Sequence, residues 1–278
     1  MKIRHLCLLA TVLCITCAAP SAAEEPAPAA TGKVTATATA TIDVKASANP
    51  LPEITADPAK WKPLITTADF AGWKKPVAEW AMVGEVAKDS ANDKALAAKP
   101  GTGIIYNGPK GRTKDIFTEG EFGDIAIHIE FMISAKSNSG IYFLGSYELQ
   151  VYDSFGVEKD AYPGIECGGI YERWDASRGK GKEGYEGHSP RVNVSKAPGE
   201  WQTFDVIFQA PKFDAAGKKT ANAKFVKVVY NGTVIHENVE LTGPTRGGAA
   251  EKAAGPLRLQ GDHGPVAYRN IRVLEMGK

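Results

Sequence analysis

The sequence predicts an all-β fold, a jelly-roll sandwich of two antiparallel sheets. Apolar and polar residues alternate with the period of a strand in several segments, and Gly and Pro interrupt the chain at the spacing of strand ends. No stretch shows the 3.6-residue period of an amphipathic helix. Strands with one apolar side form sheets that pack face to face. In such a sandwich one sheet is often concave, and its outward residues can line a groove for a sugar chain.

The first 60 residues precede the predicted domain. A charged start, an apolar run from Leu6 to Cys17 and small residues up to Ala23 predict a secretory signal peptide over residues 1–23. Lipid modification at Cys17 is the alternative, and the expected location is the periplasm or the cell exterior. Residues 24–60 contain 10 Ala, 6 Thr and 5 Pro, and this composition predicts a flexible tether.

The predicted domain spans residues 61–278 and consists of strands and turns. After N-terminal loops that contain Trp73 and Trp80, the alternation predicts strands at 103–106, 125–133, 141–144, 147–152, 201–208, 225–230, 234–235, 257–260 and 268–274. In the second of these, four Ile residues and Phe131 share one face while His128 and Glu130 share the other. Asn231-Gly232 predicts a two-residue hairpin turn.

The hairpin over residues 138–153 is the most informative part of the domain. In its second strand Glu148, Gln150 and Tyr152 share one face, because successive side chains point to opposite sides. One bulged residue between Gln150 and Asp153 would bring the Asp153 carboxylate to the Glu148 side and make a face with two carboxylates. The alternative is a solvated strand face that ends in an Asp-Ser turn.

Composition and charge exclude several classes of function. With 278 residues, 43% of them hydrophobic and 23% charged, the chain can bury a core, and no transmembrane span is expected in the mature protein. A formal charge of +1 and a pI near 7.6 argue against nucleic acid or an anionic membrane as partner. We therefore expect an uncharged ligand, and the sequence does not indicate an oligomeric state. Cleavage after Ala23 leaves Cys167 as the sole cysteine, which we expect to be buried and unpaired.

Several short motifs carry a resemblance to a known family. In chain order they are Glu130-Phe131, Asn138-Ser139-Gly140-Ile141-Tyr142, Tyr147-Glu148-Leu149-Gln150-Val151-Tyr152-Asp153, Gly168-Gly169-Ile170-Tyr171, Pro198-Gly199-Glu200-Trp201, Asn231-Gly232, Leu259-Gln260-Gly261-Asp262-His263-Gly264 and Arg269-Asn270-Ile271. In the order and spacing of these motifs, residues 61–276 resemble the 3-keto-disaccharide hydrolase domain family. The resemblance implies a concanavalin-like jelly roll that acts on 3-keto-glycosides. The chain departs from the family in its closing motif, usually Gln-Asp-His-Gly, because Gly261 stands between Gln260 and Asp262.

The chemistry of a 3-keto sugar suggests roles for these residues. The ketone acidifies the proton on C2, so a base can remove it, the enolate can expel the group on C1, and water can add back. Glu148 is the candidate base, His263 the candidate acid for the leaving oxygen, and Asp153 a supporting catalytic residue. Asn138, Gln150 and Arg258 are candidate donors to the C3 oxygen, and the candidates for further substrate contacts are Tyr171, Gln260 and Glu130.

Simpler interpretations remain open for several of these residues. His263 can be a hydrogen-bonding loop residue, and Arg258 can pair with a carboxylate on a neighbouring strand. Tyr171 can pack rather than stack on a sugar, and Glu130 can be an outward residue with a local partner. A noncatalytic carbohydrate-binding module of the same fold is the alternative function.

We expect the chain to need no cofactor and no catalytic metal. His128 and Glu130 are two residues apart on one strand face and can chelate, but the sequence offers no evident third ligand. A structural calcium ion in the loop over residues 153–160 is an open possibility without further support.

Overall fold

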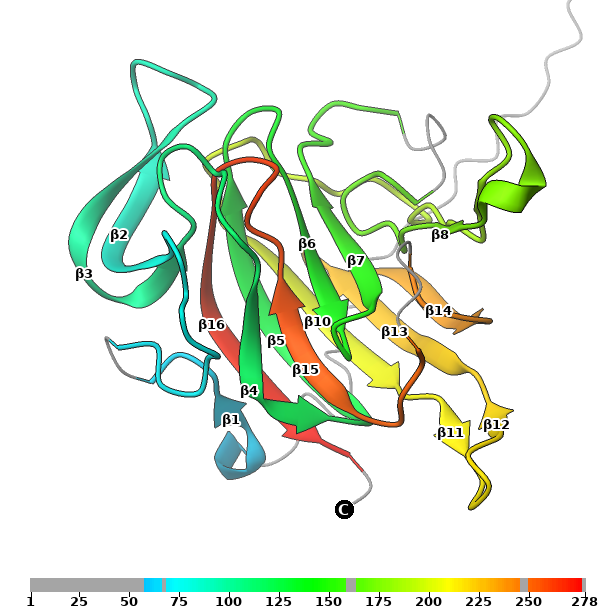
Figure 1. Cartoon of the computed structure of the whole chain (residues 1–278). Coiled ribbons are helices and arrows are strands. Elements are labelled where there is room, and N and C mark those ends of the chain that lie inside the picture. Colours follow the sequence, from blue (N-terminus) through cyan, green and yellow to red (C-terminus); the bar gives the residue numbers. More distant parts are fainter. Residues whose placement is uncertain (1–57, 67–68, 159–163, 246–249, 277–278) are drawn as a thin grey trace, which may run out of the picture. The chain divides into compact units, whose positions relative to one another are not determined.

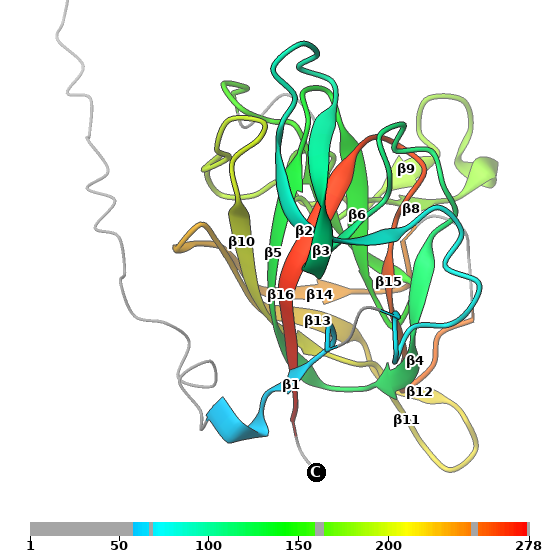
Figure 2. The ribbon, with the colours of Figure 1, turned by 90° about the vertical axis from the view of Figure 1, so that its left-hand side faces the viewer.

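Two antiparallel sheets pack face to face in the computed structural model, which describes residues 58–66, 69–158, 164–245 and 250–276 (Figures 1 and 2). The predicted all-β sandwich is confirmed. The predicted signal peptide lies outside the described residues, as does most of the predicted tether. Within the described part of the chain, no helix is long and apolar enough to span a membrane.

The larger of the two sheets, called the large sheet here, has eight strands in the order β14-β13-β10-β5-β16-β3-β2, with β1 paired to β16. Their bounds are β1 Lys62–Pro63, β2 Ala81–Lys88, β3 Leu96–Tyr106, β5 Ile125–Ile133, β10 Gln202–Gln209, β13 Ala223–Tyr230, β14 Thr233–Leu241 and β16 Val266–Glu275. Asn231 and Gly232 have φ values of 47° and 81° and join β13 to β14. Two positive φ values in a two-residue turn are typical of type I′ hairpins, so the predicted turn is confirmed.

The small sheet has four strands in the order β4-β15-β6-β7. Their bounds are β4 Ile116–Phe122, β15 Gly255–Leu259, β6 Asn138–Phe143 and β7 Tyr147–Tyr152. Short elements complete the described chain: β8 Arg173–Trp174 with β9 Gly184–Tyr185, β11 Lys212–Phe213 with β12 Lys219–Ala221, and the 3-10 turns η1 Pro58–Lys60 and η2 Ala176–Arg178.

The core lies between the two sheets. Alternate residues of β5 point into it, and Ile127, Ile129 and Phe131 have no exposed surface. Phe131 stacks on Phe204 of β10 with ring centroids 5.0 Å apart. Burying a side chain of this size contributes about 1.5–3 kcal/mol, so the alternating apolar positions dictate which face of each strand turns inward. Cys167 is also buried and unpaired, as predicted.

The β6–β7 hairpin positions the candidate site. Gly140 pairs with Gln150 and Tyr142 with Glu148, and the pairing continues regularly to Asn138 and Tyr152. The prediction that Glu148 and Gln150 share one face is confirmed, and this is the outer face because Leu149 between them belongs to the core. Of the two alternatives for Asp153, the bulge after Gln150 is absent, since the strand register does not shift before β7 ends.

Candidate active site

A pocket of about 180 Å³ opens on the outer face of the small sheet. It is called the Glu148 pocket here and is lined by Asn138, Tyr142, Glu148, Gln150, Tyr171, Gln260 and His263. Six of these seven residues are candidates from the sequence, and Tyr142 is the addition. The volume is below the roughly 300–1,000 Å³ typical of pockets for drug-sized ligands, so it suits a single sugar ring.

The carboxylate of Glu148 lies in a space that its neighbours on β6 leave open. Glu148 is 4% exposed, and a Cβ atom built on Gly140 would lie 2.4 Å from its Oε1 atom. Tyr142, the cross-strand partner of Glu148, donates a hydrogen bond to the same carboxylate. Gly140 and Tyr142 therefore fix the carboxylate at the pocket wall.

Tyr142 stays a neutral hydrogen-bond donor. Burial and the charge of Glu148 raise the pKa of its hydroxyl far above the usual range, while Arg258 acts in the opposite direction. The Arg258 guanidinium stacks on the Tyr142 ring at 4.2 Å from the centroid. Sequence reasoning missed Tyr142 as a site residue, because a loop of only Gly145 and Ser146 between the predicted strands would place Phe143 opposite Glu148, whereas in the structure Phe143 pairs with Tyr147 and Tyr142 with Glu148.

Three amide side chains present unsatisfied acceptors at the Glu148 pocket. The side-chain oxygens of Asn138, Gln150 and Gln260 are buried and have no hydrogen-bond partner in the protein. A buried polar atom without a partner costs about 1–3 kcal/mol, so water or a polar ligand in the pocket would stabilise these three oxygens. Sugar hydroxyl groups are donors that would match these oxygens.

His263 lies at the exposed rim of the pocket. Its side chain is 48% exposed, and its Nδ1 atom forms a hydrogen bond with the Asp262 carboxylate. The backbone carbonyl of His263 accepts a 3.2 Å hydrogen bond from the backbone amide of Asn138, which ties this loop to the start of β6. Since Nδ1 is engaged by Asp262, any contact of this ring with a ligand in the pocket would be made through Nε2.

The extra glycine in the closing motif allows this loop to pass close to its neighbour. The Gly261 amide donates to Asp115 at 2.9 Å, and a Cβ atom on Gly261 would lie 2.7 Å from the Lys114 carbonyl oxygen. Only glycine fits this approach. As a result, Gln260 and His263 both line the pocket on either side of Gly261.

The segment that carries Tyr171 extends the small sheet beyond β7. The Tyr171 amide donates to the Glu148 carbonyl at 3.1 Å, and the backbones of Gly168 and Gln150 bond at 2.8 Å. His236 of β14 supports this segment, because its Nε2 atom lies 2.7 Å from the Gly168 carbonyl oxygen. Burial lowers the pKa of His236 to about 4, so the ring is neutral at pH 7 and Nε2 donates its proton to the carbonyl.

Asp153 and Glu130 do not reach the pocket, which corrects two expectations. The Asp153 carboxylate accepts from the backbone amides of Lys136 at 2.8 Å and Phe155 at 3.4 Å, so it ends β7 in a turn. Glu130 lies on the outer face of the large sheet and accepts from Arg269 at 2.6 Å. Although burial opposes the effect, hydrogen bonds from Asn270 and Arg269 lower the pKa of Glu130. Its carboxylate therefore has the local partner that the simpler interpretation expects.

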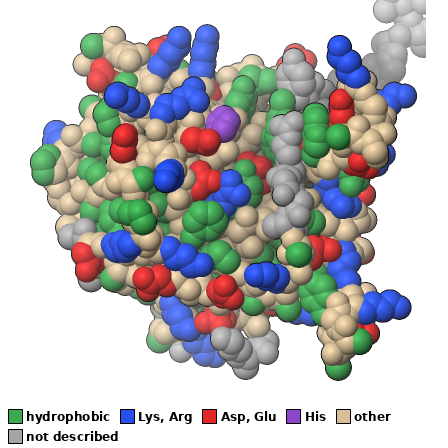
Figure 3. All heavy atoms as spheres, viewed as in Figure 1, with side chains coloured by type: hydrophobic (Ala, Val, Ile, Leu, Met, Phe, Trp, Pro, Cys, Tyr) green, Lys and Arg blue, Asp and Glu red, His purple; other side chains and the backbone are tan. Residues whose placement is uncertain are grey.

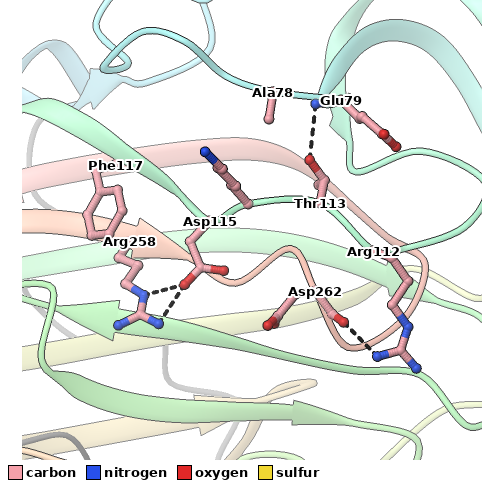
Figure 4. Close-up of a pocket in the computed structure, with 9 residues that line it drawn as sticks. Ala78, Glu79, Arg112, Thr113, Asp115, Phe117, Arg258 and Asp262 are labelled. Atoms are coloured by element: carbon pink, nitrogen blue, oxygen red, sulfur yellow. Dashed lines mark hydrogen bonds and ion pairs between the residues drawn. The ribbon is translucent and has the colours of Figure 1, made fainter.

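Arg258 lies beside the Glu148 pocket rather than in it. Its Nε atom donates to Asp115, the residue just before β4, over 2.6 Å, which confirms a pair with a neighbouring carboxylate. Arg258 lines a larger pocket of about 830 Å³, called the Arg258 pocket here, together with Ala78, Glu79, Arg112, Thr113, Lys114, Asp115, Phe117 and Asp262 (Figure 4).

The possible metal ligands have other partners. His128 Nδ1 lies 2.7 Å from Asp205, while its Nε2 atom is 3.8 Å from Glu130. Among the residues that the structure describes, no group of three or more His, Cys, Asp or Glu side chains is placed to hold a metal ion. The loop proposed for calcium runs partly outside those residues, because 159–163 are not described.

A model of a known protein family matches most of the chain. The sequence model of the 3-keto-disaccharide hydrolase family, described as the 3-keto-alpha-glucoside-1,2-lyase-like domain, matches residues 60–274. No curated protein sequence matches the chain.

Two solved structures are similar to the fold. A candidate glycosyl hydrolase from Parabacteroides distasonis ATCC 8503 has 25% identity over 78% of this chain and 84% of that chain, with a TM-score of 0.54. A second candidate glycosyl hydrolase from the same organism has 18% identity over 78% of this chain and 99% of that chain, with a TM-score of 0.51. The second likeness concerns the fold alone.

Proposed function

Because the chain belongs to the 3-keto-alpha-glucoside-1,2-lyase-like domain family, we propose that it is an exported enzyme that cleaves 3-keto-glycosides or 3-keto-disaccharides. The observation that carries the proposal is the buried Glu148 carboxylate, which lies in one small pocket with three unsatisfied amide oxygens. The amide oxygens can accept hydrogen bonds from the hydroxyl groups of a sugar, and the carboxylate beside them can remove a proton from one of its ring carbons.

The proposed reaction begins with proton transfer. Glu148 takes the proton from C2, and the electrons of the C–H bond form the enolate of the C3 ketone. Amide groups of Asn138 and Gln150 would donate to the enolate oxygen, where negative charge develops. Tyr142 and Gly140 hold the base in place, so the carboxylate does not have to reorganise when the substrate binds.

The bond to the leaving group breaks next. The enolate electrons form a C1–C2 double bond while the C1–O electron pair leaves with the glycosidic oxygen. His263, oriented by Asp262 at Nδ1, would protonate that oxygen from Nε2. Release of the unsaturated sugar makes the enzyme a lyase. Addition of water across C1 and C2 gives net hydrolysis, and neither course needs a cofactor.

Product analysis tests this function directly. The mature domain is incubated with a 3-keto-disaccharide, and the products are separated by chromatography. We expect the free leaving sugar together with either the unsaturated 3-keto product or its hydrate. If the domain binds the disaccharide without turnover, the noncatalytic carbohydrate-binding module is the correct alternative.

A further inference from the structure

The Glu148 pocket is one of three depressions that follow β15 across the small sheet. Three outward residues at alternate positions, Pro256, Arg258 and Gln260, each line a different one. The third depression, of about 200 Å³, is called the Tyr147 pocket here and includes Tyr147 and Glu251. Between the outward residues, Leu257 and Leu259 are buried in the core. The regular alternation of β15 therefore sets the three pockets in a row.

Neighbouring pockets share walls rather than being separated by the fold. Between the first two, Tyr142 of the Glu148 pocket stacks on Arg258 of the next, and His263 pairs with Asp262. Between the second and third, Phe117 lines both. At about 3.3 Å per residue, the four steps from Pro256 to Gln260 span about 13 Å, which is longer than one pyranose ring.

The chemistry of the middle pocket suits a neutral, hydroxylated ligand. Its lining has three cationic side chains, Arg112, Lys114 and Arg258, and three carboxylates, on Glu79, Asp115 and Asp262, so the formal charge is balanced. Acidic and basic side chains are interspersed across this face of the molecule (Figure 3). Phe117 adds an aromatic surface that is only partly buried. Carboxylates accept hydrogen bonds from hydroxyl groups and Arg or Lys side chains donate to them, while an aromatic ring packs on the apolar face of a sugar.

The pocket at the far end continues this character. Tyr147 donates a 2.7 Å hydrogen bond to Glu251, which also pairs with Lys219 at 2.7 Å. Lys252 and Ser146 line the same depression. Acidic and basic side chains therefore line the pockets from the candidate base to the opposite end of the small sheet.

We propose that the leaving group of the substrate is itself a saccharide chain of at least two rings. The 3-keto ring occupies the Glu148 pocket, the first leaving ring lies over Phe117 and Arg258, and the next reaches the Tyr147 pocket. This inference rests on the proposed function for the identity of the reactive ring. It makes the enzyme one that acts at the ends of oligosaccharides and favours them over simple glycosides.

A series of substrates of increasing length tests the inference. The probes are methyl 3-keto-glucoside, the 3-keto-disaccharide and the 3-keto-trisaccharide, each oxidised at the non-reducing glucose, in the α-1,4 and β-1,4 series. We expect kcat/KM to rise about tenfold with each added ring in one series, equivalent to about 1.4 kcal/mol per ring. In the Phe117→Ala variant, the total increase in kcat/KM from the methyl glycoside to the trisaccharide should be less than about tenfold.

A matched variant and a binding measurement separate the possible outcomes. Trp201→Ala removes a partly buried aromatic residue from the opposite side of the sandwich and should preserve the length dependence. If kcat/KM is flat or falls with length in both series, or if Phe117→Ala retains the full gain, the inference is wrong while the proposed function stands. If no 3-keto-glycoside is turned over, the proposed function is wrong. In that case, calorimetric titration with maltotriose and cellotriose tests the inference separately. If the protein binds these trisaccharides no more tightly than methyl glucoside, the inference is wrong as well.

Discussion

Gly140→Ala should inactivate the protein without unfolding it. The added Cβ atom would lie 2.4 Å from Glu148 Oε1 and 2.8 Å from a ring carbon of Tyr142. Since carbon contacts are optimal near 3.5 Å, the carboxylate must move by about 1 Å. A displacement of this size at a reacting group can cost about 100-fold in rate. Gly140 does not have a positive φ, so alanine can adopt its backbone conformation, and the Glu148 side chain can yield through its free rotations.

The assay measures kcat and KM on a 3-keto-disaccharide together with the thermal unfolding midpoint. Gly120→Ala is the matched control, because this glycine lies in β4 of the same sheet and its added Cβ atom would make only ordinary contacts of 3.5 Å or more with Phe122. We expect Gly140→Ala to lose about 100-fold in kcat at a nearly unchanged midpoint, and Gly120→Ala to lose little. Turnover of Gly140→Ala within about threefold of the unchanged protein would refute the assignment of Glu148 as a precisely held base.

Three further predictions concern protonation and burial. His263→Ala should slow the release of alkyl leaving groups more than that of 4-nitrophenol, since a good leaving group needs no acid; equal losses would contradict the role. Burial holds the pKa of His236 at about 4 against about 6.5 when unfolded, so the unfolded chain binds the extra proton and stability falls as pH drops from 6.5 to 4. Urea unfolding should show a loss of about 3 kcal/mol over this range that His236→Gln abolishes, and a loss that persists in the variant would have another source. Burial also raises the pKa of Cys167 to about 11, so a thiol reagent at pH 8 should label it only after unfolding, and fast labelling of the native protein would contradict this.

Local patterns predicted the centre of the site because it lies within one hairpin. The alternation in 147–152 is enough to place Glu148 and Gln150 on one face. It does not give the register, because Leu144 belongs to the loop rather than, as predicted, to the first strand, and this pairs Tyr142 with Glu148. Gln260 and His263 join them from the loop that follows β15, more than 100 residues later. Only the resemblance to a family connected these residues, since alternation within a strand contains no information about which strands pair.

The expectations that failed depend on tertiary structure. Asp153 follows β7, and whether a bulge turns its carboxylate depends on the bonds that it finds, here with the amides of Lys136 and Phe155. Glu130 and Glu148 are both outward strand residues, but β5 and β7 belong to different sheets, so they face opposite sides of the sandwich. A one-dimensional pattern distinguishes outward from inward positions and cannot distinguish two outward faces.

The strand pair β2–β3 was largely missed for a different reason. The first seven residues of β3 after Leu96 are exposed and include Pro100 and Gly101, so they lack the alternation that indicates a strand. Gly84 and Gly101 lie so close that an added Cβ atom on Gly101 would be 2.5 Å from the Gly84 Cα atom. The buried residues of this hairpin, among them Val83, Val86 and Leu96, are separated by exposed stretches rather than alternating with polar residues, so hydrophobic periodicity does not detect it.

Deuterium incorporation by the Glu148→Gln variant tests the central claim most directly. In D₂O, the hydrated 3-keto sugar released by the unchanged protein should carry deuterium at C2, because the proton that Glu148 removes exchanges with solvent before water adds and the carbon is protonated again. An unsaturated product should have lost the C2 proton altogether. Glu148→Gln should lose about 100- to 10,000-fold in turnover and show no C2 exchange, while it still binds the disaccharide in a calorimetric titration. Hydrolysis by the unchanged protein with no deuterium at C2, or near-full turnover by the variant, would contradict proton abstraction by Glu148.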